Sequence, residues 1–91
     1  MAKKVIVKKE VKLTTEDQVE HQIKNLGARI KQLRIAKGYT NAEFFAYDHK
    51  INRSQYGKYE RGEDLRFSSL VRIIQIHNLT LPEFFNDGFE V

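Results

Sequence analysis

The residues with the clearest chemical pattern lie in the dodecamer INRSQYGKYERG, residues 51–62. At helical spacing Tyr56 and Tyr59 share one face. The opposite face carries basic, small polar and glycine residues, namely Arg53, Ser54, Gly57, Lys58 and Arg61. In the major groove of DNA, Arg and Lys favour guanine, Gln favours adenine and Ser is permissive. We therefore expect contacts with base edges along this face, with Gln55 at its margin and Arg61 on phosphate.

The glycine at the centre of this face is unusual, because Gly costs roughly 1 kcal/mol relative to Ala in an exposed helix interior. A helix that is pressed into a groove gains from having no side chain at its closest point. Gly57 is therefore expected to be a position of close approach. Relief of crowding around Tyr56 is the structural alternative.

Two short helices must present this face. The first is expected at about 41–49 with Thr40 or Asn41 as its cap, and the second at about 52–61 with Asn52 as its cap. Because almost no residues separate them, the pair must form a sharp corner that presents the second helix outward. We also expect Thr40 and Asn41 to contact DNA.

A long amphipathic helix is expected before this pair, at about 16–37, ending at Gly38. Thr15 and Gln18 stand at capping-box spacing, and Gly27 marks a candidate break. The apolar residues of this helix recur at intervals of four and three, at Val19, Ile23, Leu26, Ile30 and Leu33. The heptads are too few for a coiled coil, so core packing is the expected use.

Two further helices are expected after the pair. Ser68 or Ser69 opens the first, which ends near Asn78, and a capping box of Thr80 and Glu83 opens the second. Phenylalanines are expected in the core, namely Phe44, Phe45, Phe67, Phe84 and Phe85.

The charge of the chain is unevenly distributed. The net charge of the 91-residue chain is +4, with +4 on residues 1–13, −3 on 14–21, +6 on 22–62 and −3 on 63–91. A basic block between acidic flanks suits a polyanionic partner, although charge alone fits a solvated surface equally well.

Composition and motifs argue against several classes of protein. The absence of cysteine excludes disulfides and thiolate metal sites and suits a reducing, cytoplasmic location. The apolar run near the start is too short for a signal peptide or a membrane span. His21, His49 and His77 fall on different predicted helices without a carboxylate at ligand spacing. We therefore expect no metal, no cofactor and no enzymatic activity.

From Gly27 to Phe85 the sequence resembles the Cro and phage-repressor type of helix-turn-helix domain, also called lambda-repressor-like or Xre. The matching segments are LGARIKQLRIAKGYT, NAEFFAYDHKIN, RSQYGKYERG and SSLVRIIQIHNLTLPEFF. The resemblance implies an all-α, five-helix domain over 15–86, after a basic arm at 1–14 and before a short tail at 87–91. It also implies sequence-specific binding of double-stranded DNA, a repressor-like role in transcription and, commonly, a homodimer.

The resemblance further implies an ion pair between Arg34 of the first helix and Glu60 at the end of the recognition helix. Two residues depart from the family pattern. Lys50 stands where the turn usually holds glycine, and His49 takes a position that is usually aliphatic.

Two alternatives remain open from the sequence. The domain could instead be a protein-interaction module, such as an antitoxin, that holds a partner protein by its basic face. The arm at residues 1–14 could be a β-strand that pairs with a second subunit, or a basic tail that follows DNA.

Overall fold

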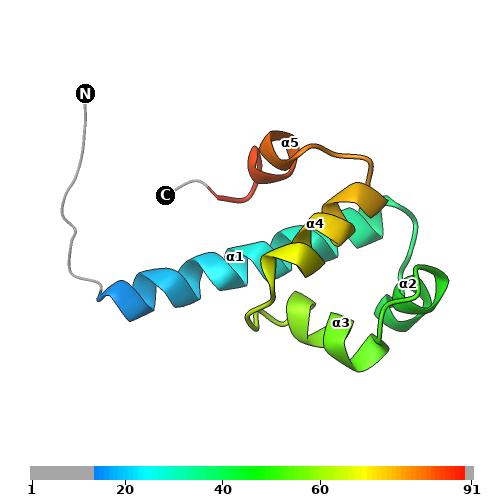
Figure 1. Cartoon of the computed structure of the whole chain (residues 1–91), viewed down its shortest axis with the longest axis horizontal. Coiled ribbons are helices and arrows are strands. Elements are labelled where there is room, and N and C mark those ends of the chain that lie inside the picture. Colours follow the sequence, from blue (N-terminus) through cyan, green and yellow to red (C-terminus); the bar gives the residue numbers. More distant parts are fainter. Residues whose placement is uncertain (1–13, 90–91) are drawn as a thin grey trace.

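The computed structural model describes residues 14–89, so the expectations for the arm lie almost entirely outside the described residues. Residues 14–89 form helices joined by short loops and contain no strand, which confirms the all-α, five-helix fold (Figure 1). The helices are α1 (Thr15–Ala36), α2 (Ala42–Asp48), α3 (Arg53–Glu60), α4 (Phe67–Ile76) and α5 (Leu81–Phe85).

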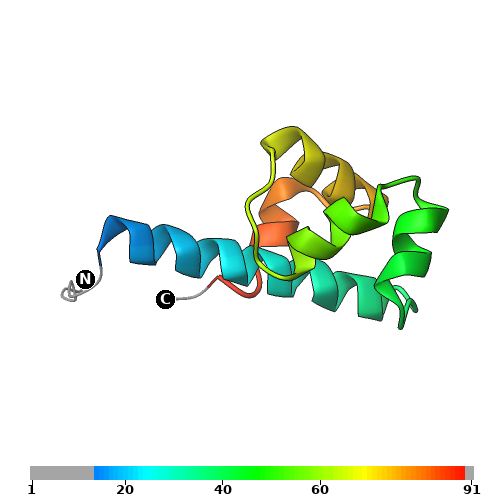
Figure 2. The same cartoon turned by 90° about the horizontal axis from the view of Figure 1, so that it is seen from below.

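The second half of α1 packs against the helices that follow it. Helix α1 packs against α2 and α3, α2 packs against α3, and α4 packs against α5. The first half of α1 extends past the rest of the helices in both views (Figures 1 and 2). The domain that carries the basic face is thus built on only part of its longest helix.

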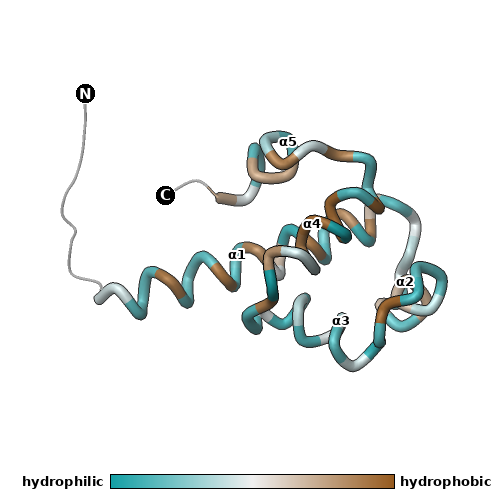
Figure 3. The backbone as a smooth tube through the Cα atoms, viewed as in Figure 1, coloured by the Kyte–Doolittle hydropathy of each residue, from teal (hydrophilic) through white to brown (hydrophobic). Residues whose placement is uncertain are grey.

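Every helix contributes to one apolar core, and the tube coloured by hydropathy shows the apolar positions of α1 and α4 (Figure 3). The core residues are Ile30, Phe45, Ala46, Tyr56, Tyr59, Leu70, Ile73, Ile74 and Phe84. Three of the phenylalanines expected in the core are instead exposed, by 67% at Phe44, 64% at Phe67 and 40% at Phe85. Adjacent helical residues point about 100° apart, so only one ring faces the core in the Phe44–Phe45 pair and in the Phe84–Phe85 pair.

The apolar stripe of α1 is only half used by the core. Ile30 is fully buried, whereas Val19 is 51% exposed. Core packing of the whole stripe was therefore a wrong expectation, because no other helix lies beside its first half (Figure 2). Gly27 does not break the helix, which is continuous from Thr15 to Ala36.

Two helices begin earlier in the chain than expected. Helix α1 is capped by Thr14 and not Thr15: Thr14 Oγ1 accepts from the Asp17 amide at 3.0 Å, and Asp17 Oδ2 accepts from the Thr14 amide at 3.4 Å. Helix α4 begins at Phe67, before the expected serines, and its N-cap Arg66 makes no side-chain capping bond. The capping box that opens α5 is confirmed.

The first four helices end in the same way, with a residue of positive φ just beyond the C-cap. These residues are Gly38 (φ 102°), Lys50 (φ 59°), Gly62 (φ 87°) and Asn78 (φ 58°). In each case this residue and the next donate their amides back to carbonyls of the last turn, which is the Schellman motif. Short loops and sharp changes of direction follow from this shared ending.

Candidate nucleic-acid interface

The corner between α2 and α3 is fixed by two asparagine caps. Asn41 Oδ1 accepts from the amides of Glu43 at 2.7 Å and Phe44 at 3.2 Å, so Asn41, and not Thr40, caps α2. Asn52 Oδ1 accepts from the Gln55 amide at 2.9 Å and caps α3, as expected. Both caps leave the corner only four residues long between the helices.

Lys50 takes the left-handed conformation that the turn requires. The Lys50 amide donates to the Tyr47 carbonyl at 3.2 Å, and the Ile51 amide donates to the Ala46 carbonyl at 2.8 Å. For a residue other than glycine, the left-handed conformation costs about 1–2 kcal/mol relative to the right-handed conformation. The corner therefore keeps the helix-turn-helix course without the usual glycine, with strain stored at Lys50.

Two tyrosines anchor α3 to the core. Tyr56 is fully buried and Tyr59 is 6% exposed, which confirms that both face inward. The centre of the Tyr56 ring lies 5.0 Å from the centre of the Phe45 ring of α2, and the centre of the His49 ring lies 4.5 Å from the same Phe45 ring. Burial raises the pKa of the Tyr56 hydroxyl, so it remains protonated and neutral in the core.

An ion pair ties the end of α3 to α1. Arg34 Nε donates to Glu60 Oε2 at 2.8 Å and Arg34 Nη2 donates to Glu60 Oε1 at 3.0 Å, so the pair that the resemblance implies is present. The third donor of Arg34, Nη1, reaches the Tyr39 carbonyl at 2.8 Å. The hydrogen bonds to Glu60 raise the pKa of Arg34. Together the three donors join α1, α3 and the α1–α2 loop.

The end of α3 also approaches the backbone of α1 at Gly27. A Cβ at Gly27 would lie 2.6 Å from the Tyr59 carbonyl oxygen and 2.9 Å from the Glu60 carbonyl oxygen. The glycine therefore permits close packing of the two helices instead of interrupting α1. This contact and the Arg34–Glu60 pair together set the direction in which α3 points.

The opposite face of α3 is open. Arg53, Ser54, Gln55 and Lys58 are exposed, and Arg61 follows them at the C-cap. Apart from its two chain neighbours and the backbone of its own helix, the nearest atom that a Cβ on Gly57 would meet is Arg61 Nη1, at 3.1 Å. The structure thus gathers the expected α3 residues on one solvent-facing surface, which we call the α3 polar face.

Two arginines of the α3 polar face have acidic neighbours. Arg53 Nη1 lies 3.5 Å from Glu43 Oε1, and Arg61 Nε lies 3.8 Å from Glu63 Oε2. All four side chains are more than half exposed. Such exposed pairs contribute about 0–1 kcal/mol, so a competing anion can replace the carboxylates.

Thr40 and Asn41 directly precede α2. The Arg53–Glu43 pair links the first turn of α2 to the first turn of α3. Both Thr40 and Asn41 are exposed, although the Asn41 side-chain oxygen is already used as a cap. The structure therefore links the first turn of α2, which follows these two residues, to the first turn of α3.

Two aromatic residues beside Arg53 are exposed, and the sequence did not lead us to expect either of them at the surface. Phe44 is 67% exposed and Tyr47 is 81% exposed, and they line a hollow with Glu43, Ile51 and Arg53. Their signal in the sequence was the crowding of three aromatic residues into a seven-residue helix, which has one buried face.

Within residues 14–89, no three side chains of His, Asp or Glu are grouped so that they could hold a metal ion. None of the helices described is both long and apolar enough to cross a membrane. The basic block at residues 22–62 includes α2 and α3, and four of its nine basic residues, Lys50, Arg53, Lys58 and Arg61, lie between the α2–α3 corner and the C-cap of α3.

The sequence was compared with known proteins. The chain matches the helix-turn-helix family model HTH_3 over residues 30–84, which runs from the second half of α1 to α5. No curated protein and no solved structure matched it. The sharp α2–α3 corner, the anchored third helix and this match over more than half of the chain agree with one another. The chain therefore belongs to the Cro-type helix-turn-helix family, whose members are DNA-binding regulators.

Proposed function

We propose that this protein binds duplex DNA in a sequence-specific way by placing α3 in the major groove, and that it acts as a repressor of transcription. The observation that carries the proposal is the division of α3 into two faces. Tyr56 and Tyr59 anchor one face in the core, while the α3 polar face is exposed and basic. A helix of this kind fits the major groove, and its donors suit base edges and phosphates.

The residues of the α3 polar face have different roles in this proposal. Arg53, Ser54 and Lys58 contact base edges, with Gln55 at the margin. Arg61 is the C-cap residue of α3 and contacts a phosphate of the DNA backbone. This contact replaces the weak, exposed ion pair of Arg61 with Glu63. Thr40 and Asn41 contact the backbone from the start of α2, which is where the first helix of such a pair crosses the DNA.

Gly57 supports the proposal because nothing inside the described protein fills the space in front of it except the end of Arg61. An alanine at this position should fit once Arg61 moves aside, whereas a leucine should hold the helix away from the groove floor. Gly57→Leu is therefore expected to fold normally and to bind DNA poorly, while Gly57→Ala should retain most of the affinity.

The test is a binding titration on duplexes selected from a random pool, repeated at several salt concentrations. The proposal predicts that log K falls linearly with log salt concentration and that the selected duplex binds more tightly than a shuffled duplex. Absence of duplex binding at low salt would contradict the proposal. That result, with capture of an acidic protein partner through the same face, would favour the protein-interaction alternative instead.

A further inference from the structure

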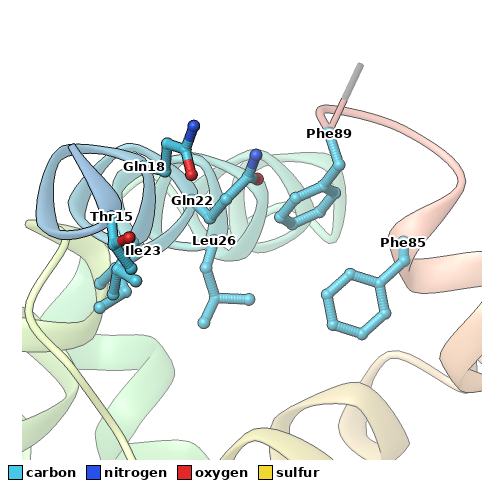
Figure 4. Close-up of a pocket in the computed structure, with 8 residues that line it drawn as sticks. Thr15, Gln18, Gln22, Ile23, Leu26, Phe85 and Phe89 are labelled. Carbon is cyan, nitrogen blue, oxygen red and sulfur yellow. The ribbon is translucent and has the colours of Figure 1, made fainter. Parts of the chain in front are cut away.

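An apolar groove lies outside the α3 polar face, along the first half of α1. Its apolar lining consists of Val19, Ile23 and Leu26 of α1, Phe85 of α5 and Phe89 just beyond α5. The rings of Phe85 and Phe89 lie 5.0 Å apart and face Leu26 across the groove (Figure 4). Contiguous apolar surface of this kind on a small protein marks an interaction site.

The groove continues the apolar stripe that the core uses. Ile30, the next stripe residue after Leu26, is fully buried by the domain's own helices, but Val19 is 51% exposed. The apolar stripe of α1 is therefore covered by other helices along its second half, whereas within residues 14–89 no helix covers Val19 in the first half. The family match covers residues 30–84, so the residues that line the groove all lie outside the matched segment.

The charges along α1 are arranged to suit a copy of the same helix. Residues 14–21 carry Glu16, Asp17 and Glu20 and have a net charge of −3. Residues 22–31 carry Lys24, Arg29 and Lys31 and no acid, giving a net charge of +3. Arg29 already donates to the carbonyls of Phe84 and Glu83 and lies beside Asp87, so Lys24 and Lys31 are the exposed cations of this segment. In an antiparallel pair of α1 helices, the acidic turns of each copy lie toward the basic half of the other. A parallel pair would set like charges side by side.

We propose that two copies of this chain associate through this groove, with the first turns of each α1 lying antiparallel in the groove of the other. In such a two-fold contact each stripe residue is buried twice, once in each copy, because the same surface is used by both. Val19 of one copy replaces water over Ile23, Leu26 and the Phe85–Phe89 pair of the other. The α3 polar face takes no part in the contact and remains free in both copies.

The association is tested by sedimentation equilibrium of the full chain without DNA, so its outcome is separate from DNA binding. The wild type should sediment at twice the chain mass of 10.7 kDa. Val19→Glu should sediment as a monomer with unchanged helix content, because Val19 is half exposed and contributes little to the fold of one copy. His21→Glu adds the same charge on the exposed far side of α1 and should remain a dimer.

Two results would overturn the proposal. One is a wild type that sediments as a monomer up to several hundred micromolar, and the other is a dimer that Val19→Glu leaves intact. Deletion of residues 2–12 tests whether the N-terminal arm, and not the groove, holds the two copies together. A dimer that survives Val19→Glu but is lost on this deletion would assign the contact to the N-terminal arm.

Discussion

Arg34 and Glu60 join the end of α1 to the end of α3 through two hydrogen bonds of 2.8 and 3.0 Å, and both side chains are more than nine-tenths buried. Breaking such a pair leaves an uncompensated charge in the interior, which costs about 3–5 kcal/mol. Arg34→Met and Glu60→Gln should therefore each lower the free energy of unfolding strongly in urea titrations. Glu63→Gln, which removes the exposed partner of Arg61, is the control and should change it by less than about 1 kcal/mol. Equal, small effects of all three would mean that the pair contributes nothing to stability.

The contact of Gly27 with α3 predicts opposite effects of one substitution at two glycines. Gly27→Ala would place a Cβ 2.6–2.9 Å from backbone atoms of the α3 end, and rigid backbone cannot yield cheaply, so it should destabilise the fold. Gly57→Ala meets only the flexible end of Arg61 and should stabilise the helix by roughly 0.5–1 kcal/mol. Thermal unfolding followed by circular dichroism measures both. A neutral Gly27→Ala would show that the helices separate without cost.

The strain at Lys50 predicts that glycine is better at this position. Its positive φ of 59° costs roughly 1–2 kcal/mol, while glycine adds about 0.5–1 kcal/mol of backbone entropy to the unfolded chain. Lys50→Gly should therefore raise the free energy of unfolding by roughly 0.5–1 kcal/mol. Asn78→Gly is the matched comparison at φ 58° and should gain less, because asparagine tolerates this conformation. Destabilisation by Lys50→Gly would contradict the account of the turn.

The free energy of unfolding should decrease at acidic pH because of His77. Its ring stacks on Phe45 at 5.5 Å, and burial, with the charges of Lys37, His49 and Arg29, lowers the pKa of His77 to about 4 from 6.5. The unfolded chain then binds the proton first, so stability present above about pH 6.5 is lost as the pH falls toward 4. Chemical denaturation from pH 7 to pH 4 should give a steeper loss for the wild type than for His77→Gln. His21→Gln, on exposed α1 surface, should keep the wild-type slope.

Periodicity and spacing in the sequence predicted the helices and the two faces of α3, because these depend on residues three and four positions apart. The burial of Tyr56 and Tyr59 follows from this local pattern. The exposure of Val19 could not be predicted, since it depends on where distant helices end. The cap at Thr14 was missed because Asp17 and Gln18 are both suitable capping-box partners for two adjacent threonines.

Contact of α3 with base edges can be measured by comparing alanine variants on a selected and a shuffled duplex. Arg53→Ala, Ser54→Ala and Lys58→Ala should each cost roughly 1–3 kcal/mol on the selected duplex and relax the preference at one base position. Arg61→Ala should weaken binding to both duplexes alike and reduce the salt slope by about one. Full affinity and unchanged preference in the variants at Arg53, Ser54 and Lys58 would contradict the placement of α3 in the major groove.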